Sequence, residues 1–157
     1  MKENNPVVAP IIATPGFLRR IAAMCYDSLL LFALIFVVLL ISFAVFLPFN
    51  SAEALVAKKI FSPLASLLVS FLFLGWFWTH GGQTLGCRAW KIKVETQDQQ
   101  PLNWTIAAQR FCHALLSWLP AGLGYLWMIF DKNNLAWHDI FSETRVVFDE
   151  SYSPKQK

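Results

Sequence analysis

Charged residues are scarce in this sequence. They make up 15% of its 157 residues, whereas an ordinary soluble domain contains about 25%. Three long blocks, residues 28–52, 60–87 and 111–130, contain no Asp, Glu, Lys or Arg. A helix that crosses a bilayer needs roughly 20 mostly apolar residues, so each block is long enough. The scarcity of charge therefore excludes an ordinary soluble domain and predicts one compact integral membrane domain.

Several functional motifs are missing as well. The three cysteines form no CxxC pair, which argues against a disulfide framework or a zinc site. The sequence has no HExxH spacing, no phosphate loop and no recognisable nucleophile–base constellation, so we expect no enzyme activity, no cofactor and no bound metal. Zinc-finger and RNP-like motifs are also missing, which argues against nucleic acid as a partner.

Two transmembrane helices are expected in the first half of the chain. The first is predicted over residues 17–47, where Pro48 ends it. Residues 48–59 are expected to form a short connection. The second helix is predicted over residues 60–79, with Pro63 in its first turn, where a missing N–H does little harm.

The distribution of cations predicts the orientation of these helices. Lys and Arg precede the first helix and follow the second, so the positive-inside rule favours a cytoplasmic N-terminus. Two lysines in the connection argue mildly the other way. The cations concerned are Lys2, Arg19, Arg20, Arg88, Lys91 and Lys93, against Lys58 and Lys59.

The second half is predicted to be more irregular. Residues 90–95 alternate apolar and charged side chains, as a half-buried strand does, and residues 144–148 are β-prone and form their only plausible partner. Asn103 is a plausible N-cap for a helix that ends at Trp118, and a second short helix is expected over residues 123–130.

Two arrangements of the broken segment at residues 111–130 are compatible with the sequence. It is either one kinked span or a hairpin that enters and leaves the membrane on the cytoplasmic side. Pairing of the two strands requires the hairpin, which we favour. The predicted fold is an all-α integral membrane domain over residues 16–148, with two transmembrane helices, this broken third segment and a small cytoplasmic two-stranded β element. Residues 1–15 and 149–157 are expected to be flexible tails.

Asp27 is the most informative candidate residue, because an ionisable group in a membrane helix is costly and normally faces the bundle interior or a water-filled cavity. Arg20 lies on the same helix face, but roughly 10 Å away along the axis, which is too far for direct contact to be expected. One interpretation is a buried carboxylate that fixes helix packing through Arg110 or a backbone group. The other is a group that handles cations or protons.

Other ionisable residues are candidates in the second half. Arg110 and His113 form a polar stripe with Ser117. This stripe is either the solvent-exposed face of the helix or contains a functional pair. In the second case Arg110 would pair with Asp27 or Asp131, and His113 would titrate near neutral pH. His138 and Asp139 are adjacent, and we expect a turn at these residues to clamp the tail by hydrogen bonds.

Together these residues resemble the RDD family of bacterial membrane proteins. The resemblance rests on Arg20-x-x-Ala23-x-x-x-Asp27, on Gly82-Gln83-Thr84-Leu85-Gly86 followed by Lys91-Ile92-Lys93-Val94, on Arg110, and on an ending with Phe130-Asp131, His138-Asp139 and Thr144-Arg145-Val146-Val147. Either Asp131 or Asp139 is the second name-giving aspartate. The resemblance implies a bacterial inner-membrane protein and a role in transport, with cation/proton exchange the usual suggestion.

Two functions remain open from the sequence. In the first, Asp27 responds to ions or protons, the charges of Arg20 and Arg110 tune its pKa, and Asp131 or Asp139 gates from the cytoplasmic side. Three or four short helices cannot easily enclose a transport path through the membrane, so such a transporter should form a homo-oligomer or join a partner membrane protein. In the second, the chain is a non-transporting binding or assembly module with a charged cytoplasmic platform. The expected partners are the lipid bilayer and, for transport, cations or protons.

Overall fold

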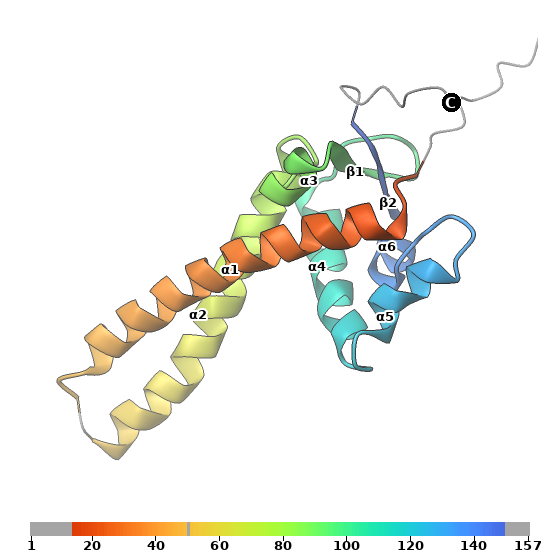
Figure 1. The fold of residues 1–157 in the computed structure, drawn as a ribbon. Coiled ribbons are helices and arrows are strands. Elements are labelled where there is room, and N and C mark those ends of the chain that lie inside the picture. The colour runs from red at the N-terminus through yellow and green to blue at the C-terminus, as the bar shows by residue number, and fades with distance from the viewer. Residues whose placement is uncertain (1–13, 50, 150–157) are drawn as a thin grey trace, which may run out of the picture.

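The computed structural model describes residues 14–49 and 51–149, and helices dominate it (Figure 1). The helices α1 (Phe17–Phe46) and α2 (Ala52–Thr79) form a long hairpin, and each is long and apolar enough to cross a membrane. Most of their large apolar side chains point outward, as lipid contact requires. The first expected helix is therefore confirmed. The predicted flexible tails lie almost wholly outside the described residues.

The second helix begins at Ala52 and not near residue 60, so the predicted connection over residues 48–59 is wrong. Ser51 caps the helix by accepting a hydrogen bond from the Ala54 N–H (3.2 Å). The Ala, Leu and Lys residues that follow are strong helix formers, which extends the helix through the two lysines. Pro63 consequently lies inside α2 and not in its first turn.

A small polar region gathers at the other end of the hairpin. The short helix α3 (Leu85–Ala89), which was not expected, leads into the strand β1 (Ile92–Thr96). This strand pairs antiparallel with β2 (Thr144–Phe148), with Ile92 opposite Phe148 and Thr96 opposite Thr144. The predicted strand pair is thus confirmed, although β1 starts two positions later than expected, because Trp90 caps α3 and Lys91 adopts a positive φ.

The broken helical segment is bent by 108°. It consists of α4 (Trp104–Trp118), α5 (Leu123–Leu126) and the 3-10 helix η1 (Trp127–Ile129), and Gly122 provides the positive φ of 79° at the break. Asn103 caps α4 as expected, accepting from the Ile106 N–H (2.8 Å). Since β1 precedes this segment and β2 follows it, the chain returns to the side from which it left. Of the two predicted arrangements, this geometry favours the hairpin.

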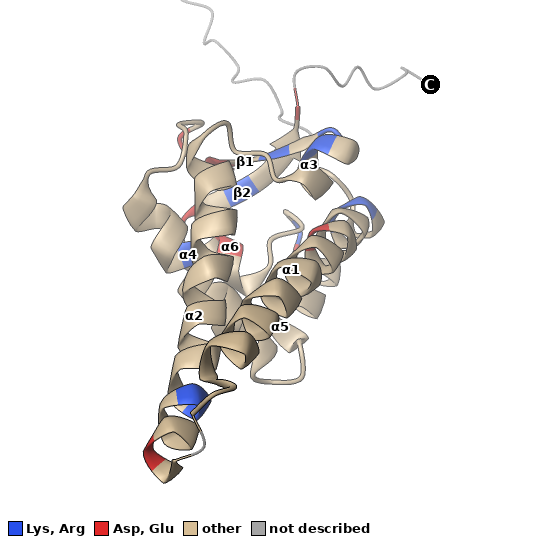
Figure 2. Ribbon diagram, turned by 90° about the vertical axis from the view of Figure 1, so that its left-hand side faces the viewer, with Lys and Arg blue, Asp and Glu red and all other residues tan. Residues whose placement is uncertain are grey.

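Charge is confined to the two ends of the α1–α2 hairpin. Figure 2 shows blue and red segments near the sheet and near the start of α2, separated by a tan stretch. Residues 28–46 and 60–79 carry no charge, and helices of this length rise about 27 and 29 Å. The hydrocarbon core of a bilayer is about 30 Å thick, so the uncharged stretches match it.

The apolar core lies where α1, α2 and α4 meet the sheet. It includes Ala23, Trp78, Val94, Ala107 and Phe111. The last short helix, α6 (Trp137–Phe141), packs against α4 and leads into β2. The core therefore holds the sheet end of α1 and the short C-terminal elements in one body, and the candidate residues lie within it.

Candidate functional site

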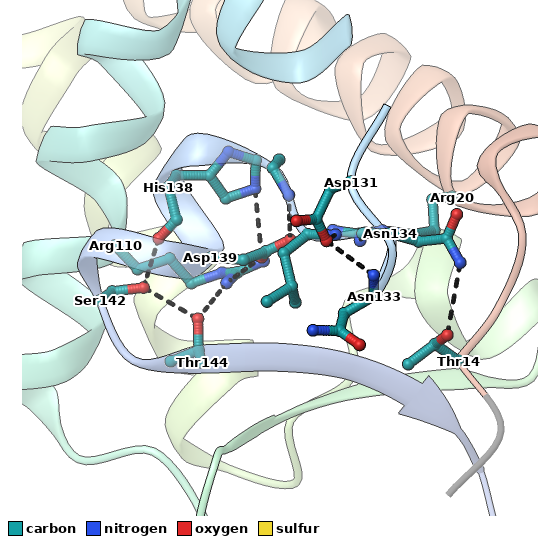
Figure 3. Close-up of polar contacts among 12 residues, drawn as sticks. Thr14, Arg20, Arg110, Asp131, Asn133, Asn134, His138, Asp139, Ser142 and Thr144 are labelled. Atoms are coloured by element: carbon teal, nitrogen blue, oxygen red, sulfur yellow. Dashed lines mark hydrogen bonds and ion pairs between the residues drawn. The ribbon is translucent and has the colours of Figure 1, made fainter. Parts of the chain in front are cut away.

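Asp139 is the centre of a buried polar cluster. It lies on α6, is fully buried, and accepts hydrogen bonds from Arg20 of α1 and from Nη1 of Arg110 on α4 (2.6 Å). Its Oδ2 also accepts from the Ala136 N–H (3.0 Å), at the start of its own helix. Figure 3 shows these side chains converging from three elements. One carboxylate thus joins α1, α4 and α6.

Surrounding groups accept further hydrogen bonds from the two guanidinium groups. Arg20 also donates to the Asn134 carbonyl, and Arg110 to the Thr144 hydroxyl. The Ser142 hydroxyl lies 2.8 Å from that of Thr144 and donates to the His138 carbonyl (2.5 Å). The cluster fixes the loop before α6 and the start of β2.

The electrostatics keep Asp139 ionised and His138 neutral. Burial opposes ionisation of Asp139, but the charges of Arg20 and Arg110 outweigh it and hold the pKa of this carboxyl well below its usual range. Burial lowers the pKa of His138 to about 3, against the opposing effect of Asp139. Two cations around one anion leave this cluster with excess positive charge.

Asp27 makes a second, separate set of contacts. Its Oδ1 accepts from the Gly86 N–H (2.8 Å), and its Oδ2 accepts from the Thr84 hydroxyl (2.5 Å). Thr84 also caps α3, accepting from the Cys87 N–H (3.1 Å). Among the described residues Asp27 forms no ion pair. Asp27 therefore helps to dock α3 on α1 through hydrogen bonds and not through an ion pair.

Close packing at Gly86 makes these contacts possible. A Cβ atom on Gly86 would lie 2.2 Å from the Ala23 carbonyl oxygen and 2.9 Å from the Asp27 carboxyl. Ala23, four positions before Asp27, is itself 2% exposed. Small residues on both sides thus let α3 approach α1.

A cavity of about 520 Å³ connects the two sets of contacts. It runs between α1, α2 and α4, and its lining extends along α1 from Arg20 to Ile35, roughly 22 Å along the helix axis. Most of the lining is apolar. Asp27, Arg110 and His138 line it as well, so one end of the cavity is charged.

The structure brings together four of the predicted site residues, namely Arg20, Arg110, His138 and Asp139, and places Asp27 on the same cavity. The suggested pairing of Arg110 with Asp27 or Asp131 is wrong, because Arg110 pairs with Asp139. Asp139 does hold parts of the chain together by hydrogen bonds, but these parts are α1 and α4; the C-terminal tail that it was predicted to clamp lies almost wholly outside the described residues.

Two candidates lie apart from this group. Asp131 accepts hydrogen bonds from the N–H groups of Asn133 and Leu135 (both 2.9 Å) and so closes a turn. The His113 ring packs on Phe141, with 5.3 Å between centroids, and lines a smaller cavity. Neither residue lines the large cavity.

Sequence reasoning missed Thr84, Thr144 and Ser142 as members of the site. Thr84 precedes Leu85 as an N-cap precedes a helix, and that pattern was available in the sequence. Thr144 and Ser142 carried no comparable pattern, because their partners come from distant parts of the chain. Ordinary hydroxyl residues become part of a buried network only when the fold brings a charged group to them.

Comparisons with known proteins identify one family. The family model described as the RDD family matches residues 14–143, which covers α1 through α6 and all seven candidate residues. No curated protein and no solved structure matches the chain.

Proposed function

The chain belongs to the RDD family, and from this premise we propose that it is a bacterial inner-membrane transport protein in which Asp27 responds to cations or protons. The observation that carries the proposal is the position of Asp27 on the large cavity, with hydrogen bonds but no ion pair among the described residues. Asp139, by contrast, is enclosed by two guanidinium groups.

Exchange at Asp27 would be coupled to the contact between α1 and α3. A cation or proton bound to this carboxylate competes with the Thr84 hydroxyl and the Gly86 N–H for the same oxygen atoms. Losing these hydrogen bonds would release α3 from α1 and alter access to the charged end of the cavity. We propose no gate at Asp139 or Asp131, because the hydrogen bonds of both residues already have a structural role. Asp139 joins α1, α4 and α6, and Asp131 closes a turn.

The transport proposal requires assembly beyond one chain. Two spans and one bent segment do not enclose a continuous path, so we propose a homo-oligomer or a complex with another membrane protein. A strictly monomeric protein that supports flux would contradict this part of the proposal. The mass of the reconstituted particle measures the oligomeric state.

The experiment is proton flux in vesicles that hold the purified protein, driven by sodium, potassium or lithium gradients. We expect Asp27→Asn to abolish the flux, because an amide neither carries the charge nor exchanges the proton. Asp131→Asn is the matched control, because it makes the same chemical change outside the cavity and should retain flux.

A non-transporting binding or assembly module is the second candidate. The hydrogen bonds of Asp27 favour it, because docking α3 on α1 is enough to explain why this carboxylate is buried. This function predicts no flux from folded wild-type protein with any of the three cations, and loss of partner capture in Asp27→Asn. Absence of flux in wild type would therefore overturn the transport proposal.

A further inference from the structure

The depth of α3 along the α1–α2 hairpin is fixed by its contacts with α1. The Gly86 N–H donates to Asp27 Oδ1 (2.8 Å), and the backbone of Gly86 packs directly on the Ala23 carbonyl. Ala23 and Asp27 lie roughly 8 and 2 Å, measured along the helix axis, before Ser28, where the uncharged stretch of α1 begins. The lipid head groups add about 5–8 Å on each side of the hydrocarbon core. When the uncharged stretches occupy that core, α3 therefore lies at the depth of the head groups on the sheet side.

The exposed side of α3 and of the turn that follows it is basic. Residues 54–94 contain no Asp or Glu, whereas Arg88, Lys91 and Lys93 lie within six positions of one another. The side chains of Arg88 and Lys91 are exposed, and neither forms an ion pair with any residue that the structure describes. Lys93, by contrast, is half-buried and lies 3.8 Å from Glu95. Two cations on this surface are thus not neutralised within the described part of the chain.

The end of α3 holds these two cations beside an exposed tryptophan. The Lys91 N–H donates to the Arg88 carbonyl (3.2 Å), and Lys91 adopts a positive φ of 53°, so the chain turns sharply after the helix. Trp90, inside this turn, is 42% exposed. Arg19 of α1 donates to the Trp90 carbonyl (3.5 Å) and adds a third cation nearby.

One acidic residue also lies close to this turn. The Asp149 N–H donates to the Lys91 carbonyl (3.0 Å), which places a half-buried carboxylate beside the three cations Arg19, Arg88 and Lys91. The surface consequently keeps an excess of positive charge. In Figure 2 the blue segments of α3 and of the start of α1 lie at the same end of the molecule.

The combination of charge, tryptophan and depth selects one class of partner. Tryptophan is enriched at the membrane–water interface, where an apolar ring with a polar N–H suits the head-group layer. Exposed Lys and Arg residues at this depth attract the phosphates of anionic lipids. A soluble acidic partner would have to displace lipid head groups to reach the same surface. We propose that Arg88, Trp90 and Lys91 form a surface that binds the head group of an anionic phospholipid in the sheet-side leaflet.

This inference requires insertion of the hairpin in a bilayer and is independent of transport. The lipid would bind whether or not Asp27 exchanges cations or protons. It also differs from a general attraction of the chain to anionic membranes, because it assigns the preference to the end of α3. The test therefore has to report on that position alone.

The test is local fluorescence quenching in nanodiscs of phosphatidylcholine. A bimane fluorophore is attached at Ala89→Cys, an exposed position between Arg88 and Trp90, in a chain whose three native cysteines are replaced. Phosphatidylglycerol and phosphatidylcholine, each with a nitroxide on the acyl chain near the head group, are compared as quenchers. At about 0.1 M salt we expect phosphatidylglycerol to quench half-maximally at a mole fraction about 25-fold lower, because each of two exposed cations contributes about fivefold (about 1 kcal/mol).

Variants assign the preference to the two cations. Arg88→Gln and Lys91→Gln should each lower it about fivefold, and Arg88→Lys, which keeps the charge, should retain it. Lys132→Gln, the same change in the exposed turn before α6, is the matched control and should also retain it. In 1 M salt the preference should be largely lost, because the screening length falls to about 3 Å.

Three results would overturn the proposal. Equal quenching by the two lipids would show that Arg88 and Lys91 are simply solvated. A preference that survives both glutamine variants, or that Lys132→Gln lowers equally, would indicate attraction by the net charge of the chain. Absence of quenching by either lipid would place α3 outside the head-group layer. None of these results depends on whether flux is observed.

Discussion

Asp139 accepts hydrogen bonds from three elements while it is fully buried. A buried ion pair is not by itself strongly stabilising, because the charges lose their hydration. Removal of one partner, however, leaves the others buried and unpaired. The structural importance of Asp139 therefore lies in the two guanidinium groups that depend on it.

Asp139→Asn should destabilise the protein strongly, by about 3–5 kcal/mol. The amide cannot neutralise Arg20 and Arg110, which stay 4% exposed. Asp131→Asn is the matched control, with an expected loss of about 1 kcal/mol or less, because its two accepted bonds lie in an exposed or half-exposed turn. Unfolding in mild detergent measures both, and equal losses would contradict the central role of Asp139.

The contact between α1 and α3 is closely packed. It depends on the missing side chain of Gly86 and on the hydrogen bonds of Asp27. Its geometry could not be predicted from sequence, because α3 has five residues and so has little periodicity to detect. Helices this short are stable only when tertiary contacts hold them.

Gly86→Ala should destabilise the protein by about 1–3 kcal/mol, because the added methyl group would overlap the Ala23 carbonyl. Gly16→Ala is the control at the start of α1, since nothing lies within 4 Å of a Cβ there. Thermal unfolding of both variants measures the difference. A Gly86→Ala protein as stable as Gly16→Ala would show that α3 moves away from α1 freely.

At the scale of the whole molecule, the charge-free stretches of α1 and α2 divide the protein into two ends. The sheet and α3 lie at one end, and the connection between α1 and α2 lies at the other (Figure 1). If the sheet end is cytoplasmic, as the positive-inside rule predicts, these two regions are on opposite sides of the bilayer.

Cysteine labelling tests this orientation. In a chain whose three native cysteines are replaced, Ser51→Cys should react with an impermeant maleimide in intact cells. Asp98→Cys, in the exposed turn after β1, should react only after the membrane is permeabilised. The reverse pattern would invert the orientation, and labelling of both in intact cells would exclude a simple hairpin through the bilayer.

Much of this architecture followed from local sequence. The extent of α1, the cap at Asn103, the strand pair and the break near Gly122 are set by neighbouring residues and by hydrophobic pattern, so they were predictable. The start of α2 was not, because a long connection and a longer helix have similar local composition. Local sequence also identified the individual candidate residues, because a charged residue within an apolar segment can be recognised without knowing the fold.

The partners of those residues were decided by the tertiary structure alone. Arg20 pairs with Asp139, which is 119 positions away, and not with Asp27 on its own helix. Arg110 pairs with the same carboxylate, so Asp27 is left with Thr84 and Gly86. The sequence determined that ionisable residues within the apolar segments must be buried, and that two helices are long and apolar enough to cross a bilayer. Which charges meet depends on how distant elements pack, because a guanidinium pairs with the carboxylate that the folded chain brings nearest.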